Sequence, residues 1–365
     1  MRKLHIVHTE ASVGWGGQEI RILTEAAGMI GRGHRITLIT PHEASIYREG
    51  KARGLDVVAL AIERKKIAGL TAILRWLRRN PVDVINTHSS TDAWLAALAC
   101  QFLKKPPPIV RTRHISAPVP DNMATRWLYD TATKRIVTTG ERLRNELIDR
   151  NGFDPNRITS VPTGIDTNRF VPGDKREARR RLGLSESRPT LGIVATLRDW
   201  KGHSYLLEAL AGLPDHGLWL LIIGDGPQRE ALARQIDRLG LQERVLMPGN
   251  QADVVPWIQA LDVFVLPSYA NEGVPQAILQ AMSCAIPVIS TPVGSIMEAV
   301  RQNDTGCIVA ARDPAALREA IVRLLGDAEL RLRFGNTGRK LVLEKFGLAV
   351  MLDKMESVFL AAACG

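Results

Sequence analysis

The feature that most constrains the fold is an alternation along the whole chain. Short apolar runs rich in β-branched residues alternate with longer segments of helical periodicity. This alternation is typical of parallel sheets built from strand-helix-strand units. In the first half we predict strands at 4–9, 35–41, 57–62, 82–88, 109–114, 136–139 and 158–162. In the second half we predict strands at 191–197, 219–224, 245–248, 263–267, 286–290 and 307–310.

The alternation is interrupted at residues 166–189, where prolines and a glycine flank a charged stretch. The chain has 365 residues, which exceeds one ordinary hydrophobic core. Ligands of doubly wound sheets bind at the carboxyl ends of the strands, so the loops after the strands are the expected site. We predict two doubly wound α/β domains at 1–165 and 190–345, a linker with a short helix at 166–189, and a C-terminal helix within 346–365 that packs on the first domain.

The composition disfavours several classes of protein. The four cysteines are far apart and show no C-x-x-C pairing, which disfavours a disulfide framework or a zinc site. No apolar run is long enough to span a membrane, and the N-terminus does not resemble a signal peptide, so we expect a cytoplasmic protein. The net charge of +10 resides in residues 1–170, which hold 26 Lys and Arg against 16 Asp and Glu. Such a half could face an anionic partner, or it could be a basic solvated surface.

A glycine-rich turn follows the first predicted strand. Gly16 and Gly17 precede a helical pattern, and glycines there let the backbone approach a phosphate at a helix N-terminus. The dinucleotide fingerprint would need a third glycine where Glu19 stands, which disfavours a nicotinamide dehydrogenase. By itself such a turn can also be purely structural.

Two cations follow the first strand of the second domain. Arg198 and Lys201 lie at the carboxyl end of that strand, before the next helical run. A guanidinium can bind a diphosphate in a fork, and an ammonium can bind it as a point charge. We interpret the pair as a diphosphate site, with a solvated basic turn as the alternative.

The segment 271–282 has the most specific pattern. Pro275 suits the first turn of a helix whose buried face carries apolar residues, while Gln276 and Gln280 share another face. Glu272 precedes this helix, beside amides that attract phosphates. A helix-capping carboxylate is the alternative role for Glu272.

Together these motifs resemble those of the family 4 glycosyltransferases. Further similarities are the segments 163–166 and 224–227, and the matches occur in the family's order over nearly the full length. The resemblance implies the GT-B fold, in which two Rossmann-like parallel-sheet domains face a central cleft. It also implies that the first domain binds the acceptor and the second the nucleotide-sugar donor.

Carried over by motif, the resemblance implies roles for individual residues. Arg198 and Lys201 would hold the donor diphosphate, with Gly16 and Gly17 approaching it. Glu272 would act catalytically near the donor sugar. Gly273, Val274 and Gln280 would bind the nucleotide and sugar. The family usually has Glu where this chain has Gln280, and an amide can still hydrogen-bond a ribose hydroxyl.

Strand-end residues of the first domain supply further candidates. His114 ends the strand at 109–114, where relatives place a histidine near sugar and acceptor, so we predict a catalytic role for it. His88 ends the preceding strand. Arg111 and Arg113 are two residues apart and therefore share a face. We predict acceptor binding by His88, Arg111 and Arg113, although a strand-end histidine can also be purely structural.

The resemblance implies a retaining transferase that needs no cofactor. The chain lacks a D-x-D triplet, so we expect no essential metal, and we expect no nucleic-acid partner. The expected acceptor is a glycan or lipid-linked glycan of a bacterial surface polysaccharide such as lipopolysaccharide. The basic segment 64–79 predicts contact with an anionic membrane at the cytoplasmic face of the inner membrane, or else a helix packed on the sheet. A nucleotide-sugar epimerase of the same fold and a non-catalytic binding partner remain as alternatives.

Overall fold

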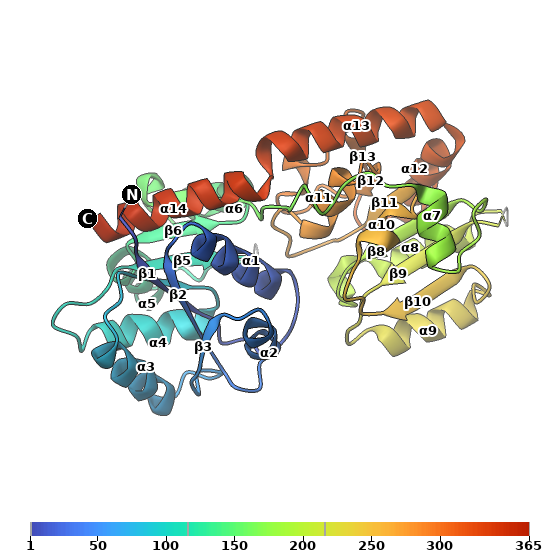
Figure 1. Cartoon of the computed structure of the whole chain (residues 1–365). Helices are drawn as coiled ribbons and strands as arrows, with labels where there is room; N and C mark the ends of the chain where they lie inside the picture. Colours follow the sequence, from blue (N-terminus) through green and yellow to red (C-terminus); the bar gives the residue numbers. More distant parts are fainter. Residues whose placement is uncertain (1, 115–116, 215–216, 365) are drawn as a thin grey trace. The chain divides into compact units, whose positions relative to one another are not determined.

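The computed structural model describes residues 2–114, 117–214 and 217–364. The chain divides into two compact units, which we call the first unit (Met1–Pro162 with Ala349–Gly365) and the second unit (Thr163–Leu348). Over the described residues each unit contains one parallel sheet with packed helices (Figure 1). The predicted fold class of two doubly wound parallel-sheet domains is confirmed.

The first unit has a seven-stranded sheet in the order β3-β2-β1-β4-β5-β6-β7, counted over the described residues. The strand order reverses between β1 and β4, which defines the crevice where such sheets bind ligands. Its strands are β1 (His5–Thr9), β2 (Arg35–Thr40), β3 (Asp56–Ala59), β4 (Val84–Thr87), β5 (Ile109–Arg113), β6 (Arg135–Thr138) and β7 (Ile158–Ser160). Its helices are α1 (Gly17–Gly31), α2 (Ser45–Ala52), α3 (Ile67–Arg79), α4 (Ser90–Cys100), α5 (Met123–Arg126) with the π-helical segment Trp127–Ala132, α6 (Glu141–Asp149), the 3-10 turn Pro155–Arg157, and α14 (Leu348–Cys364).

The second unit has a six-stranded sheet in the order β10-β9-β8-β11-β12-β13, again over the described residues. Here the order reverses between β8 and β11. Its strands are β8 (Thr190–Val194), β9 (Trp219–Ile223), β10 (Val245–Gly249), β11 (Val263–Leu266), β12 (Val288–Ser290) and β13 (Gly306–Ile308). Its helices are α7 (Lys175–Arg181), α8 (His203–Ala211), α9 (Arg229–Arg238), α10 (Val255–Gln259), α11 (Gln276–Ser283), α12 (Pro314–Gly326) and α13 (Ala328–Lys345), with 3-10 turns at Asp199–Lys201 and Ile296–Glu298.

The strands form where the sequence carries continuous β-branched and apolar runs. β11 is an example, since all four of its side chains are buried. Helices cover both faces of such a sheet, so residues of both alternating sets meet apolar partners. This burial on both faces explains why an unbroken apolar run, rather than an alternating one, predicted the strands.

The segment 166–189 belongs to the second unit. It contains α7, whose Arg179 is 4% exposed. The Arg179 guanidinium donates to the carbonyl of Ala260 at 3.0 Å and to Asp262 Oδ2 at 2.7 Å. These bonds attach the segment to the second unit, so it is not the separate linker that its composition suggested.

Residues 349–365 belong to the first unit, and α14 lies across it (Figure 1). Arg32 of the α1 C-terminal end forms ion pairs of 2.6 Å with both Asp353 and Glu356. His34 bonds the same Glu356 at 2.9 Å. The apolar face of α14 includes Phe359, which is fully buried. Polar bonds and apolar burial thus both join α14 to this unit.

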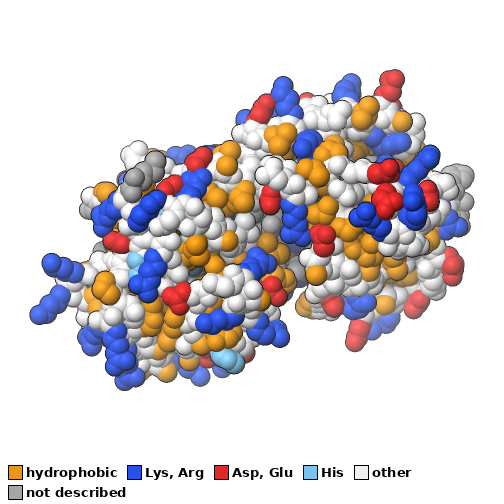
Figure 2. Space-filling view, viewed as in Figure 1, with side chains coloured by type: hydrophobic (Ala, Val, Ile, Leu, Met, Phe, Trp, Pro, Cys, Tyr) orange, Lys and Arg blue, Asp and Glu red, His pale blue; other side chains and the backbone are white. Residues whose placement is uncertain are grey.

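Helix α3 is amphipathic, as its sequence predicts. Ile73 and Leu77 are buried, whereas Ile67 at the helix start is 79% exposed. Lys and Arg side chains gather at the margin of the first unit over α3 (Figure 2). None of the helices in the described ranges is both long and apolar enough to cross a membrane.

Candidate active site

The centre of the site in the second unit is an ion pair between two strand-end loops. Lys201 follows β8 and Glu272 follows β11, and β8 and β11 are neighbours in the sheet. The Lys201 Nζ lies 2.6 Å from Glu272 Oε1, although the two residues are 71 positions apart in sequence. The side chains are 18% and 6% exposed, respectively. The fold therefore brings two of the predicted site residues into direct contact.

Glu272 is held by a second donor. The Ser268 hydroxyl donates to Glu272 Oε1 at 2.6 Å, and this bond is buried. A buried carboxylate needs such partners, because an unpaired buried charge is costly. Both bonds fall on the same oxygen, Oε1.

Two glycines allow the loops around this pair to approach. Gly202 has φ of +78°, and a Cβ there would lie 2.1 Å from the carbonyl oxygen of Pro267. Gly294 has φ of +56°, and a Cβ there would lie 1.9 Å from the carbonyl oxygen of Glu272. Only glycine fits such contacts without a backbone shift. The turn after β8 and the loop after β12 can therefore pack directly against the loop after β11.

Arg198 is exposed, and its guanidinium lies 5.3 Å from the centre of the Trp200 ring. It forms no ion pair with any residue that the structure describes. Asp199 of the same turn accepts a hydrogen bond at Oδ2 from the hydroxyl of Tyr269, which lies in the loop after β11. The Arg312 guanidinium stacks 4.1 Å from the centre of the Tyr269 ring. Arg198 is thus a cation at the carboxyl edge of the second sheet whose charge is available to a ligand.

Helix α11 begins at Gln276, one residue after Pro275. Gln276 and Gln280 are both half-buried on the helix side away from the core, as predicted from their spacing. Val274 is 4% exposed and packs in the hydrophobic core, so only its backbone is placed to reach a ligand. Gly273 is buried as well. The roles in nucleotide and sugar binding of Gly273, Val274 and Gln280 stay predictions.

The site in the first unit is a chain of three histidines. His8 Nδ1 lies 2.9 Å from His88 Nε2, and His88 Nδ1 lies 2.9 Å from His114 Nε2. The His8 and His88 rings stack, with centres 5.2 Å apart. Both ring nitrogens of His88 are therefore occupied by neighbours, and the side chain is 5% exposed. This arrangement does not fit the direct acceptor contact predicted for His88, and it fits a residue that positions His114.

Strand register explains why these three rings meet. His8 of β1 pairs with Asn86 of β4, and His88 is two residues farther along the same chain segment. Residues two apart in a strand share a face. The register between β4 and β5 gives the same two-residue offset between His88 and His114. From His8 to His88 to His114, each ring therefore lies two residues closer to the carboxyl edge of the sheet than the one before it. All three rings lie on the same face.

Burial keeps the three rings neutral. It lowers the pKa of His8 to about 3. Burial, with the neighbouring His114, His8 and Arg21, lowers the pKa of His88 well below its usual value. Burial, with Arg21 and Arg113, does the same to the pKa of His114. A neutral imidazole has one donor and one acceptor nitrogen, so the two hydrogen bonds must run in the same direction along the chain.

The direction of these bonds follows from the buried end. His8 Nε2 has no hydrogen-bond partner among the described residues. A buried donor without a partner is rarer than a buried acceptor without one, so we infer that His8 Nε2 is unprotonated. His8 Nδ1 then donates to His88, and His88 Nδ1 donates to His114 Nε2. In consequence His114 carries its proton on Nδ1 and presents an N–H donor at the end of the chain.

The predicted pair Arg111 and Arg113 share one face, as expected, and both contact Tyr129. The Arg113 Nη1 donates to the Tyr129 hydroxyl at 2.8 Å, and its Nη2 donates to the carbonyl of Ala117 at 2.6 Å. The Arg111 guanidinium lies 4.9 Å from the Tyr129 ring centre. Burial by itself would raise the pKa of Tyr129, but the two guanidinium charges outweigh burial, so the pKa is lowered. Arg111 is 6% exposed, so acceptor binding by this pair stays a prediction.

The glycine turn of the first unit opens α1, which begins at Gly17. Gly16 stands at the N-cap position, and no side chain caps this helix end. Glu10, which follows β1, supports the turn: its carboxylate accepts from the Ser12 amide at 2.7 Å and from the Gln18 side chain. Burial and the neighbouring Asp92 raise the pKa of Glu10 well above its usual value. The placement fits the predicted phosphate approach by Gly16 and Gly17, which stays a prediction.

Sequence reasoning did not identify His8, Ser268 or Glu10 as site residues. His8 stands inside a strand, and a polar residue in an otherwise apolar strand is the signal that could have found it. Ser268 and Glu10 directly follow strands, as ligand-binding residues of such sheets often do. Their partners come from distant segments, and a single sequence does not show those contacts.

Two protein families match this chain. The family described as Glycosyltransferase Family 4 matches residues 15–169. The family described as Glycosyl transferases group 1 matches residues 174–341. The first span lies on the first unit except for its last residues, 163–169, and the second span lies within the second unit.

Individual proteins are similar over most of the chain. The D-inositol 3-phosphate glycosyltransferase of Corynebacterium glutamicum (strain R) is 28% identical over 367 residues, which cover 88% of this chain and 86% of that protein. The structure of Anabaena Alr3699/HepE with UDP-glucose has a TM-score of 0.88 at 20% identity, covering 98% of this chain and 100% of that one. WaaG, a glycosyltransferase involved in lipopolysaccharide biosynthesis, has a TM-score of 0.75 at 18% identity, covering 97% and 99%. With the two parallel sheets and the two family matches, these likenesses show that the chain belongs to the family 4 type of glycosyltransferases with the GT-B fold.

Proposed function

We propose that this transferase moves a sugar from a nucleoside-diphosphate sugar to a hydroxyl group of a glycan acceptor, with retention of anomeric configuration. The observation that carries the proposal is the arrangement of Arg198, Lys201 and Glu272 at the carboxyl edge of β8 and β11. It places two cations where ligands of doubly wound sheets bind. The likeness to the Anabaena Alr3699/HepE structure, which is a complex with UDP-glucose, supports a donor of this class.

The two cations suit the step that breaks the bond between sugar and diphosphate. Negative charge develops on the leaving diphosphate, and cations already in place stabilise it without reorganisation. An ammonium has three donor hydrogens, so Lys201 can bind a phosphate oxygen while it keeps its bond to Glu272. Neutralisation of the diphosphate by Arg198 and Lys201 supports a reaction that uses no metal.

Retention is proposed without a covalent glycosyl-enzyme. A covalent route needs a carboxylate nucleophile beside a second carboxyl group. Glu272 is instead held on one oxygen by Lys201 and Ser268, which suits a carboxylate that orients the donor. The acceptor hydroxyl would attack from the side on which the diphosphate leaves. His114, as an Nδ1–H donor, would bond an oxygen of the transferred sugar.

The proposed acceptor is a glycan of a bacterial surface polysaccharide, with lipopolysaccharide as the leading case. The likeness to WaaG, a glycosyltransferase involved in lipopolysaccharide biosynthesis, supports this class. The basic first unit also suits work close to anionic lipids.

A transfer assay tests the proposal. The full chain is incubated with UDP-glucose or GDP-mannose, with and without a mixture of saccharide acceptors, and products are followed by mass spectrometry and proton NMR. We expect an acceptor-dependent product that is one sugar heavier and keeps the α configuration of the donor. A β-linked product would contradict retention. Conversion of the nucleotide-sugar without an acceptor would favour an epimerase instead.

A further inference from the structure

Arg312 has a backbone conformation that arginine rarely adopts. It lies in the loop that follows β13, at the carboxyl edge of the second sheet, and its φ is +61°. This left-handed region is unfavourable for a residue with a Cβ, whereas glycine adopts it freely. A strained arginine at a strand end where doubly wound sheets bind ligands indicates that its side chain serves the site.

The Arg312 guanidinium stacks over the ring of Tyr269. It lies 4.1 Å from the ring centre, and a cation over an aromatic face is attracted by the ring. Among the residues that the structure describes, Arg312 has no ion pair and no side-chain hydrogen bond. Tyr205 of α8 packs edge-on against the same Tyr269 ring, with ring centres 6.1 Å apart. Side chains from two other segments therefore hold the Tyr269 ring.

Tyr269 is bonded to the turn that separates the two cations of the proposed donor site. Its amide donates to the carbonyl of Trp200 at 2.8 Å, and its hydroxyl donates to Asp199 Oδ2. Asp199 and Trp200 are the two residues between Arg198 and Lys201. The arrangement of the two cations relative to each other therefore depends on the bonds that Tyr269 makes.

Asp199 is an acid at the place proposed for an anionic ligand. A free carboxylate there would repel a diphosphate, because like charges repel. The hydrogen bond from the Tyr269 hydroxyl instead keeps the Asp199 carboxylate on a protein partner. The bond thus orients the turn and restrains the one negative charge within it.

We propose that Arg312 and Tyr269 are positioning residues for the donor diphosphate. Arg312 holds the Tyr269 ring, and the Tyr269 hydroxyl holds Asp199. The turn then presents Arg198 and Lys201 in the arrangement that binds the diphosphate, and cations already in place stabilise its charge without reorganisation. This inference rests on the proposed transferase function and adds two residues that act through the turn rather than on the ligand.

Substitutions of Arg312 separate the guanidinium from the backbone strain. R312A removes the guanidinium and keeps a Cβ at positive φ, whereas R312G removes both. We expect both variants to bind UDP about tenfold more weakly than the wild type in isothermal titration of the full chain. R312G should unfold at a higher urea concentration than R312A, because it relieves the strain. If affinity followed stability instead, so that R312G bound UDP like the wild type, the inference would be overturned.

The variant Y269F tests the route through Asp199. It keeps the ring that Arg312 contacts and removes the hydroxyl that bonds Asp199. We expect it to bind UDP about tenfold more weakly as well. The double variant R312A/Y269F should bind UDP about as weakly as either single variant, because both changes break the same series of contacts. Additive losses, about 100-fold together, would show that Arg312 binds the diphosphate itself and would overturn its positioning role.

Arg333 is the matched control for Arg312. It is also an exposed arginine of the second unit, and its guanidinium lies 5.4 Å from the centre of the Phe334 ring in α13. R333A should leave the Kd for UDP unchanged, and R312K should recover part of the affinity because an ammonium also binds a ring face. Equal losses in R333A and R312A would show an effect of net charge and refute the inference.

Two further outcomes separate the inference from the proposed function. If the wild type binds UDP and both R312A and Y269F bind it equally well, the positioning role fails and the proposed function stands. If the wild type binds none of UDP, GDP, ADP and TDP, the proposed function fails, and the role of Arg312 and Tyr269 toward a diphosphate fails with it.

Discussion

Replacing Lys201 with Ala is expected to lower the free energy of unfolding of the second unit by about 3 kcal/mol. The reason is that Glu272 would remain as a buried charge: its side chain is 6% exposed, and of its two hydrogen-bond donors it would keep only the Ser268 hydroxyl. Removing one member of a buried pair leaves an uncompensated charge, which costs more than the pair itself contributes. We place the expected loss at the lower end of the usual range because the Lys201 side chain is 18% exposed and water can partly reach the site. Urea unfolding of the full chain measures it.

The chain offers a matched control for Lys201. Lys175 pairs with Asp262 at the same distance of 2.6 Å, but Asp262 also accepts from Arg179 at 2.7 Å. Lys175→Ala should therefore change the free energy of unfolding by at most about 1 kcal/mol. Adding Glu272→Gln to Lys201→Ala should recover part of the loss, because it removes the orphaned charge. Equal effects of the two lysine variants, or no recovery in the double variant, would refute the account of the pair.

Replacing Arg198 with Ala is expected to weaken UDP binding by about 10- to 100-fold, the value of one charge-assisted bond to a diphosphate. Stability should change little, because Arg198 is exposed and its guanidinium packs only loosely over the Trp200 ring, 5.3 Å from the ring centre. Arg198→Lys should retain part of the affinity, since it keeps the charge but loses the fork. Isothermal titration of UDP into the full chain measures all three proteins.

Arg188 is the control for Arg198. It is also exposed, and its guanidinium lies 5.6 Å from the Trp219 ring centre, a contact like that of Arg198 with Trp200. Arg188 precedes β8 and therefore lies at the amino end of that strand, whereas Arg198 follows β8 and lies at its carboxyl end. Arg188→Ala should leave the Kd for UDP unchanged. If both variants lose affinity equally, the effect is one of net charge, and the diphosphate assignment fails.

The strands and the edge of each sheet that carries the site were predictable from the sequence. Continuous apolar runs marked the strands, because a parallel sheet buries both faces. Arg198 and Lys201 were found because they come after the first strand of the second domain, and Glu272 was found because it precedes a predicted helix. The contact between Lys201 and Glu272 was not predictable. It depends on β8 and β11 being neighbours in the sheet, and the order of strands along the sequence does not fix their order in the sheet.

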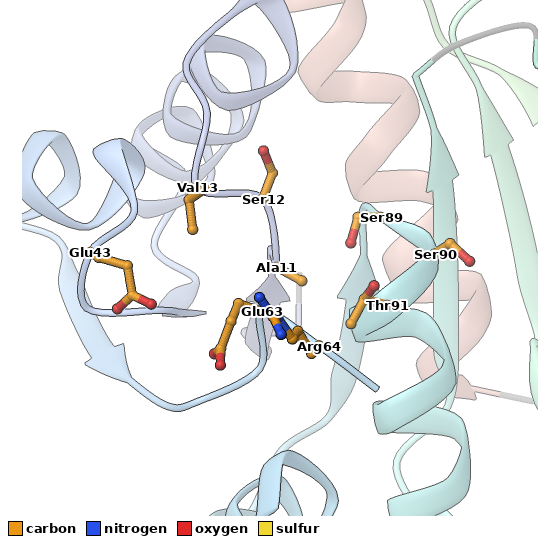
Figure 3. Close-up of a pocket in the computed structure, with 9 residues that line it drawn as sticks. All are labelled: Ala11, Ser12, Val13, Glu43, Glu63, Arg64, Ser89, Ser90 and Thr91. Carbon is orange, nitrogen blue, oxygen red and sulfur yellow. The ribbon is translucent and has the colours of Figure 1, made fainter. Parts of the chain in front are cut away.

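Other features were hidden from the sequence for physical reasons. The segment 166–189 has the charge and proline content of a linker, but a buried Arg179 that bonds Asp262 makes it part of the second unit. Glu43 and Glu63 look like ordinary solvated acids in the sequence, and only the side-by-side placement of β2 and β3 brings both into the lining of the pocket shown in Figure 3. The fit of His88 to a residue that positions His114 depends on the hydrogen bonds of its ring with the rings of His8 and His114, and a single sequence does not show those contacts.

A crystal structure of the full chain with UDP tests the central claim most directly. We predict diphosphate oxygens within hydrogen-bond distance of the Arg198 guanidinium and the Lys201 ammonium, beside the turn that follows β8. Lys201 should still contact Glu272, because its three donor hydrogens can serve both partners. A diphosphate bound away from both cations would contradict the assignment of the second unit as the donor-binding unit.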